Sequence, residues 1–230
     1  MSEPLNDLAQ ALRTTGSVRA FRPDAVSDES LLRILDHARF APSGGNQQGW
    51  RVAVVRDAER RSAVLDLMEP IAREYVALMR AGQRPFGLTD NGRWPGPGDV
   101  DLAAARSSNE LSIVAPLRAA PVLLVVAVDS GLIAAMDAEL DRHGIVAGAS
   151  IYPFCQSLLL AARLEGLGGV LTTFAVRAEP AMRALLHLPD AFALAAVIAV
   201  GYPEKQVTRL TRNPVSSFVT VDTFDGAAFG

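Results

Sequence analysis

Residues 41–50 read Ala-Pro-Ser-Gly-Gly-Asn-Gln-Gln-Gly-Trp. The two adjacent glycines let the backbone approach a flat ligand closely. The side chains of Ser43, Asn46 and Gln48 offer hydrogen-bond donors and acceptors to the edge of a heterocycle. A polar turn that only joins a helix to a strand has the same composition, so the choice between a binding loop and a simple turn depends on the rest of the chain.

The elements on either side of this loop can be predicted. Ser27 followed by two acidic residues is typical of a helix N-terminus. The apolar spacing from Leu31 onward predicts a helix that ends by Pro42, because the residue before a proline is pushed out of helical geometry. A run of β-branched residues predicts a strand over 50–55. Apolar residues at helical spacing predict another short helix over 5–12.

The remaining elements follow from apolar periodicity and apolar runs. The pattern predicts a long helix over 57–79, which Pro70 can bend. No internal repeat, low-complexity tract or domain boundary is visible, so we predict a single domain over 1–230. The other predicted elements are a strand buried on both faces at 121–128, a core helix over 147–164, a strand over 170–174, a short helix from Glu179-Pro180 and a buried strand over 194–201.

Two segments carry no periodic pattern. Residues 81–99 are rich in glycine and proline, and so long a loop inside a compact domain is typical of a functional lid or of disorder. Phe86 and Trp94 favour the lid, which would cover a planar aromatic partner. The tail over 203–230 is polar and irregular, and it contains apolar side chains that need a neighbour to bury them, namely Phe218, Val219, Val221 and Phe224.

Composition excludes several classes of partner. The chain has 25 acidic and 22 basic side chains, for a net charge of −3, whereas binding to nucleic acid or to an anionic membrane requires clustered Lys and Arg. The first residues lack the pattern of a signal peptide, and the longest apolar runs fall far short of the ~20 residues that span a bilayer. We therefore expect a cytoplasmic protein with no nucleic-acid or membrane partner. The single lysine, Lys205, among so many arginines is typical of a GC-rich bacterial genome.

Common metal and catalytic motifs are missing from the sequence. His37, His143 and His187 lie far apart, and neither CxxC nor HExxH spacing occurs, so no metal site is expected. P-loop, Rossmann-glycine and GxSxG motifs are absent as well. Cys155 lies among apolar residues, where a thiol stays protonated and unreactive. Hydrolytic chemistry therefore has no catalytic residues to use.

Three further segments carry hydrogen-bonding or cationic side chains. Ser17 and Arg19 are two residues apart, so in an extended chain both can reach one phosphate. Thr172 and Thr173 lie at the end of a predicted strand, and Arg212 lies in the tail. Each also has an ordinary structural explanation, as a solvated loop, a strand of high β-propensity and a surface arginine.

Taken together, these segments resemble the FMN-dependent nitroreductase superfamily, in its iodotyrosine deiodinase and flavin-destructase branches. The family opens with Arg-Arg-Ser-x-Arg-x-Phe, which is similar to Thr-Gly-Ser-Val-Arg-Ala-Phe at residues 15–21. Its Ala-Pro-Ser-x-x-Asn-x-Gln-Pro-Trp motif matches residues 41–50, except that Gly49 replaces the proline. Residues 161–168 resemble the helix that leads into the flavin-contacting strand, and residues 200–203 resemble the closing strand.

The resemblance implies an α+β fold with a central, mostly antiparallel sheet flanked by helices, in an intertwined homodimer. FMN would lie at the dimer interface, and the tail over 203–230 would wrap around the partner. The residues implied to bind FMN are Arg13, Ser17, Arg19, Ser43, Asn46, Gln48, Thr172, Thr173 and Arg212.

At the phosphate end of FMN, the resemblance assigns Ser17, Arg19 and Arg212 to the phosphate or the ribityl chain. Arg19 has an alternative place at the N1/O2 edge of the ring, where positive charge favours the reduced flavin. The family's first two arginines are replaced by Thr-Gly at 15–16, and Arg13 is the candidate to supply the missing charge.

At the ring end, Ser43 and Asn46 would face the ribityl chain or the ring. Thr172 or Thr173 would hydrogen-bond flavin N5, the atom that accepts and donates hydride, and so tune its chemistry. No protein residue is expected to act as an essential acid or base.

One branch of the family is disfavoured by a missing residue. Deiodinase-like enzymes clamp a zwitterionic substrate with Glu, Tyr and Lys. Glu74 and Tyr75 are present here, but no lysine precedes Lys205. This departure argues against an amino-acid dehalogenase.

The leading hypothesis is an FMN oxidoreductase of ping-pong type, reduced by NADH or NADPH. A nitroaromatic, a quinone or another electron-poor acceptor would reoxidise it, with Phe86 and Trp94 on the acceptor side. The alternatives are a flavin-binding protein without turnover that serves storage or regulation, a flavin destructase, a reductive dehalogenase, and a scaffold that has lost its cofactor.

Overall fold

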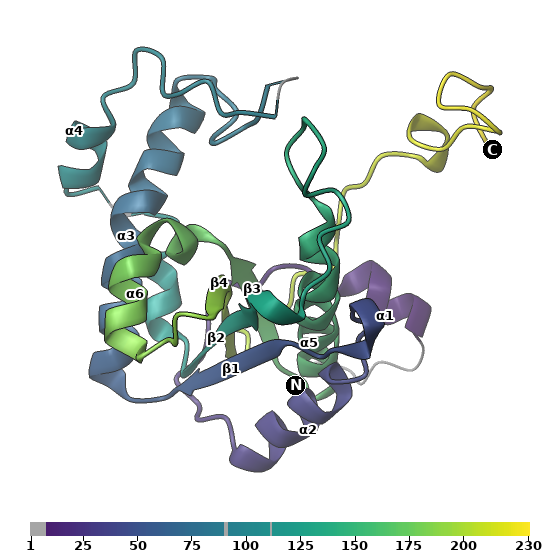
Figure 1. The fold of residues 1–230 in the computed structure, drawn as a ribbon. Helices are drawn as coiled ribbons and strands as arrows, with labels where there is room; N and C mark the ends of the chain where they lie inside the picture. Colours follow the sequence, from purple (N-terminus) through teal and green to yellow (C-terminus); the bar gives the residue numbers. More distant parts are fainter. Residues whose placement is uncertain (1–7, 90–91, 111) are drawn as a thin grey trace.

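Four strands form the centre of the computed structural model, which describes residues 8–89, 92–110 and 112–230 (Figure 1). The strands are β1 (Trp50–Val55), β2 (Val122–Asp129), β3 (Gly168–Thr172) and β4 (Phe192–Gly201). They lie in the order β1-β2-β4-β3, and every neighbouring pair is antiparallel. The predicted α+β fold with an antiparallel sheet is confirmed.

Helices cover both faces of this sheet. α2 (Asp28–Ala38) and α5 (Tyr152–Leu164) pack on one face, and α3 (Ala58–Arg80) and α6 (Glu179–Leu186) lie on the other (Figure 1). Because side chains alternate along a strand, β2 and β4 contribute to two separate cores. The core shared with α2 and α5 contains Leu124, Val126 and Ile198. The core shared with α3 and α6 contains Leu123, Val125 and Val197.

Local sequence signals set several element boundaries as predicted. The Ser27 side chain accepts a hydrogen bond of 3.1 Å from the backbone N–H of Ser30 and caps α2. The predicted helix over 5–12 corresponds to α1 (Leu8–Thr14), and its first predicted residues lie outside the described ones. One short helix, α4 (Leu102–Ser107), was not predicted.

Several predicted boundaries are wrong, and the strand predicted over 194–201 begins at Phe192. The core helix predicted from residue 147 begins only at Tyr152, because Pro153 lacks an N–H and suits the first turn of a helix. The strand predicted over 170–174 begins at Gly168 and ends at Thr172. A Cβ on Gly168 would lie 2.6 Å from a methyl group of Val18, so only glycine allows this close approach of the two segments.

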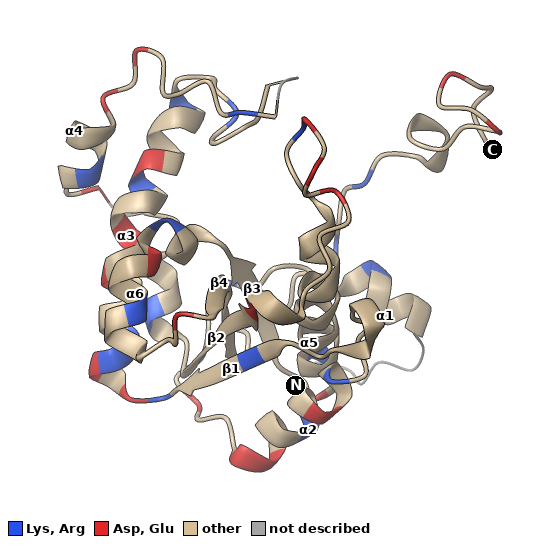
Figure 2. Cartoon of the chain, in the orientation of Figure 1, with Lys and Arg blue, Asp and Glu red and all other residues tan. Residues whose placement is uncertain are grey.

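Basic and acidic residues are mixed on the surface, and apolar side chains of the C-terminal tail are exposed. Figure 2 shows basic and acidic residues interspersed along α3. Residues 203–207 lie against the loop after α1, where the Gly16 N–H donates to the Val207 carbonyl. The later part of the tail runs away from the body of the molecule (Figure 1), and Phe218 and Phe224 in it are exposed. Within the described ranges, no helix combines the length and the apolar character needed to cross a membrane.

Candidate active site

A cavity of about 710 Å³ lies at the end of β3. This volume is within the range of roughly 300–1,000 Å³ typical of ligand pockets. Its walls come from distant parts of the chain: the loop after α1, the α3 helix, the 81–99 loop, the end of β3 and the 3₁₀ helix over Phe174–Ala178. The polar and aromatic side chains of the lining include Arg19, Tyr75, Phe86, His143, Thr172, Thr173 and Arg177.

Four of the residues predicted from sequence meet in this cavity, namely Arg19, Phe86, Thr172 and Thr173. Arg19 is placed by its neighbour Val18, which is buried and donates a backbone hydrogen bond of 2.9 Å to the carbonyl of Gly169. This bond holds the loop after α1 against β3. The Arg19 side chain therefore lies at the cavity and remains exposed.

The two threonines at the end of β3 differ in what their hydroxyl groups do. The Thr172 hydroxyl donates a hydrogen bond of 3.3 Å to the carbonyl of Val197 in the neighbouring strand. The Thr173 hydroxyl bonds to no residue that the structure describes, and this residue is exposed at the cavity. Of the two, Thr173 is the one with a donor available to a ligand.

The 41–50 loop lies outside this cavity. The Ser43 hydroxyl accepts a hydrogen bond of 2.9 Å from the backbone N–H of Gln48, so it closes the loop on itself. Asn46 and Gln48 adopt left-handed backbone angles, with φ of 53° and 51°. Such conformations are costly for residues other than glycine and concentrate at functional sites. The loop geometry therefore favours the hypothesis of a binding role over that of a simple turn.

The predicted phosphate-binding residues other than Arg19 are also outside the cavity. Arg13, Ser17 and Arg212 are exposed, and none of them lines it. The Arg212 guanidinium donates to the carbonyl of the preceding residue at 2.7 Å. Their assignment to FMN stays a prediction.

Close contacts explain why position 16 carries a glycine where the family has an arginine. A Cβ on Gly16 would lie 2.6 Å from a methyl carbon of Val207, so the tail occupies the space that a side chain would need. The Gly16 N–H donates to the Val207 carbonyl at 3.0 Å. The Thr15 hydroxyl, one residue beyond α1, donates to the carbonyl of Ala11 at 2.7 Å.

Arg177 is a cavity residue that sequence reasoning missed. Its guanidinium carbon lies 4.4 Å from the ring centroid of Phe86 and 5.6 Å from that of Trp94, distances typical of cation–π contacts. Glu74 pairs with Arg177 at 3.5 Å and also with Arg106. Glu74 is fully buried, so it holds two arginines instead of facing a substrate. A carboxylate at a core-facing position of α3 was the signal that could have revealed this cluster.

Two loops meet above the cavity. Phe86 and Trp94 make an edge-to-face contact with ring centroids 5.1 Å apart. Phe86 lines the cavity, whereas Trp94 lines a separate pocket within the 81–99 loop. Phe86 has a left-handed φ of 53°, which is rare for a bulky residue. A Cβ on Gly92 would lie 2.7 Å from the backbone nitrogen of His143, so the 81–99 loop touches the loop before α5. The lid role of residues 81–99 stays a prediction.

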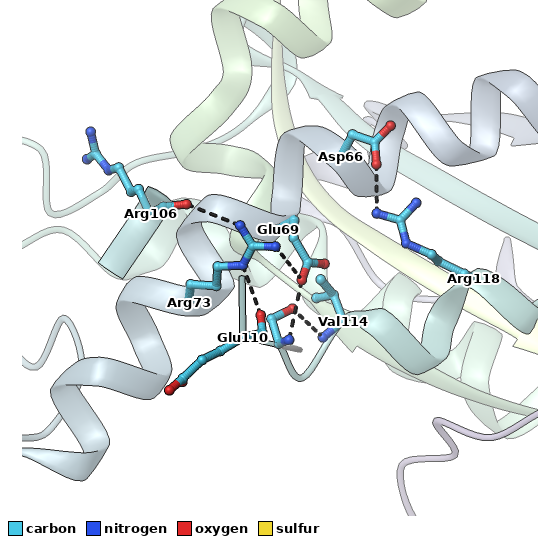
Figure 3. A network of polar contacts seen from close by, with 8 residues as sticks. Asp66, Glu69, Arg73, Arg106, Glu110, Val114 and Arg118 are labelled. Carbon is cyan, nitrogen blue, oxygen red and sulfur yellow. Dashed lines mark hydrogen bonds and ion pairs between the residues drawn. The ribbon is translucent and has the colours of Figure 1, made fainter. Parts of the chain in front are cut away.

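Hydrogen bonds and ion pairs join α3 to the segment around α4 (Figure 3). From α3, the Arg73 guanidinium donates to the carbonyls of Glu110 and Arg106 at 3.1 and 3.2 Å, and it pairs with Glu69 at 3.5 Å. Arg80, the last residue of α3, pairs with the Glu110 carboxylate. These contacts tie the second half of α3 to the end of α4 and to the chain that follows it.

Cys155 behaves as the sequence indicates. Its side chain is fully buried in α5, and burial raises the pKa of the thiol to about 12. The thiol is therefore protonated at neutral pH and unsuited to nucleophilic chemistry.

The residues of the cavity fit a flavin. Arg19 supplies a cation for an anionic part of the cofactor, and the Thr173 hydroxyl supplies a free hydrogen-bond donor. Leu171, Phe174 and Ile71 add apolar walls against which a flat ring system can pack. The fold thus defines an α+β protein whose cavity joins a cation, a free hydroxyl group and apolar walls.

Comparison with known proteins identifies the family. A family model described as the nitroreductase family matches residues 12–202, and the chain belongs to this family. It is 31% identical to the 5,6-dimethylbenzimidazole synthase of Rhodospirillum rubrum, over 82% of this chain and 78% of that one. It is 27% identical to the 4-nitrobenzoate reductase of Pseudomonas putida, over 96% and 97%.

A solved structure shows the same fold. The oxidized iodotyrosine deiodinase bound to FMN and 3-iodo-L-tyrosine superimposes with a TM-score of 0.66 at 22% identity, and the match covers 95% of this chain and all of that one. The predicted resemblance to the nitroreductase superfamily is therefore confirmed.

Proposed function

We propose that this protein is an FMN-dependent oxidoreductase that transfers hydride from NADH or NADPH to an electron-poor aromatic acceptor, such as a nitroaromatic or a quinone. Membership of the nitroreductase family supports the oxidoreductase class. The observation that carries the proposal is the cavity at the end of β3, which joins the Arg19 cation, the free Thr173 hydroxyl and the Phe86 ring.

FMN, when bound, supplies the atom that accepts hydride from the donor and passes it to the acceptor. Arg19 binds an anionic part of the cofactor, either its phosphate or its N1/O2 edge. Thr173 donates a hydrogen bond to the ring, in keeping with its free hydroxyl. Phe86 packs over the acceptor and excludes water, which assigns the 81–99 loop the role of a lid.

A second copy of the chain would complete the site. Ser43, Asn46 and Gln48 lie outside the cavity of one chain, so we infer that they reach FMN across a homodimer interface. Exposed apolar side chains on the body of the chain support this inference, namely Leu12, Met136 and Ile145. The tail over 203–230, with its exposed Phe218 and Phe224, would cover such side chains on the partner.

The test is an absorbance spectrum of the purified protein, with and without added FMN, followed by anaerobic titration with NADPH and NADH. We expect a bound flavin whose visible absorbance bleaches with one donor and returns with an electron-poor acceptor. A flavin that neither donor reduces would instead favour a storage or regulatory protein. Irreversible loss of the flavin spectrum with oxygen and reductant would favour flavin breakdown. A protein that takes up no FMN would refute the proposal.

A further inference from the structure

The charged residues of the cavity are unbalanced. Among the described residues that line it, Arg19 and Arg177 are the fixed cations, His143 is a third basic group, and no Asp or Glu is present. If Arg19 neutralises an anionic part of FMN, as the proposed function requires, Arg177 is the remaining guanidinium group among the described lining residues.

The counter-ion of Arg177 is shared. Glu74 is fully buried and pairs both with Arg177 at 3.5 Å and with Arg106. One carboxylate thus faces two guanidinium groups, so the cluster keeps one unit of positive charge. The Arg177 side chain is 37% exposed, which leaves part of its planar group accessible from the cavity.

The surroundings of Arg177 also set the shape of what it can bind. Phe86 lies against its guanidinium at 4.4 Å, and Trp94 at 5.6 Å. Phe86 lines the cavity and holds a strained left-handed φ, which indicates that the local packing fixes its position. An aromatic wall beside a planar, bidentate donor matches an aromatic ring that carries a carboxylate.

We propose that Arg177 is a specificity-determining residue that binds the carboxylate of a planar aromatic acceptor. The inference rests on the proposed function, because it assigns the acceptor side of the same cavity. Glu74 positions the guanidinium, and Phe86 packs against the aromatic ring of the bound acid.

The first measurement needs no flavin. Purified protein is titrated with benzoate and with its uncharged analogue benzamide, and binding is followed by intrinsic tryptophan fluorescence, to which Trp94 contributes. We expect Arg177→Gln to raise the dissociation constant of benzoate about 10-fold or more, because a charged hydrogen bond is lost. The dissociation constant of benzamide should stay within about 2-fold of the wild-type value. Arg118→Gln, which alters an exposed arginine paired with Asp66 outside the cavity, is the matched control.

The second measurement uses the FMN-loaded protein and compares kcat/KM for 4-nitrobenzoate and nitrobenzene. Arg177→Gln should lower the preference for 4-nitrobenzoate by about the same factor. Phe86→Leu leaves the Arg177 charge in place, so it should lower kcat/KM for both acceptors by a similar factor.

Three results would overturn the inference. If Arg177→Gln weakens the charged and the neutral ligands equally, the arginine only holds the 81–99 loop in place. If it raises the KM for NADPH and leaves the acceptor ratio unchanged, the cation serves a phosphate of the donor. If wild-type protein binds benzoate no better than benzamide, the cavity has no carboxylate site. Failure to take up FMN would refute the proposed function alone, because the benzoate comparison is independent of it.

Discussion

Replacing Glu74 by Gln should destabilise the protein far more than an equivalent change at its surface. Glu74 is fully buried between Arg106 and Arg177, and the amide of Gln cannot balance either charge. Removal of one partner from a buried ion pair costs about 3–5 kcal/mol. Here the arginine side chains are 50% and 37% exposed, so water solvates part of the released charge. We therefore expect a loss of about 2–3 kcal/mol of unfolding free energy.

The assay is thermal unfolding followed by far-UV circular dichroism at one protein concentration, since self-association would otherwise shift the midpoint. For a chain of this length, the expected loss corresponds to a fall in Tm of about 4–12 °C. Asp66→Asn is the matched control, because Asp66 and Arg118 form an ion pair of 2.6 Å with side chains 61% and 40% exposed. An exposed pair contributes about 0–1 kcal/mol. Equal, small shifts for both variants would refute the reasoning that Glu74 anchors the cluster.

Four further predictions follow from the site and from the loops around it. Arg19→Gln should weaken FMN binding about 10-fold or more, measured by recovery of free flavin fluorescence; unchanged affinity would remove Arg19 from the cofactor site. Thr173→Val should slow turnover about tenfold without abolishing it, while Thr172→Val, whose hydroxyl is used within the sheet, should have little effect; the reverse order would exchange their roles. Deletion of residues 213–230 should convert a dimer into a monomer in light scattering, and a deletion variant that stays dimeric would contradict the wrapping tail. The backbone N–H of Ile145 donates to the Asp137 carboxylate and is the main cause that lowers the pKa of Asp137 from 3.8 to about 2. The ionised Asp137 should therefore stabilise the fold fully above pH 3.8, and this stabilisation should be lost as the pH falls through about 2. The unfolding free energies of wild-type protein and Asp137→Asn should therefore differ at pH 7 and converge as the pH falls below about 2. A constant difference would contradict the assignment.

Much of the fold could be predicted because it depends on local patterns. The continuous apolar run at 121–128 indicated a strand covered on both faces, and β2 has this environment. Ser27 marked the start of α2 correctly. The boundary at α5 was missed because the apolar pattern continues through residues 146–150, where the chain forms a 3₁₀ helix before Pro153. Periodicity reports which residues are buried, and it is a weaker guide to where a helix begins.

For the site, the sequence by itself determined the family motifs and with them the candidate binding residues, since the loop at 41–50 and the Ser-Val-Arg segment can be recognised without coordinates. Only the tertiary structure decided which residues share a cavity. The cavity brings together Arg19, Thr173 and Arg177. It does so because the loop after α1 hydrogen-bonds to β3, and the 3₁₀ helix that carries Arg177 follows directly after β3. The burial of Glu74 and its two arginine partners likewise depends on how α3 packs against distant segments. Local propensity encodes secondary structure, whereas long-range packing sets which side chains come within contact of one another.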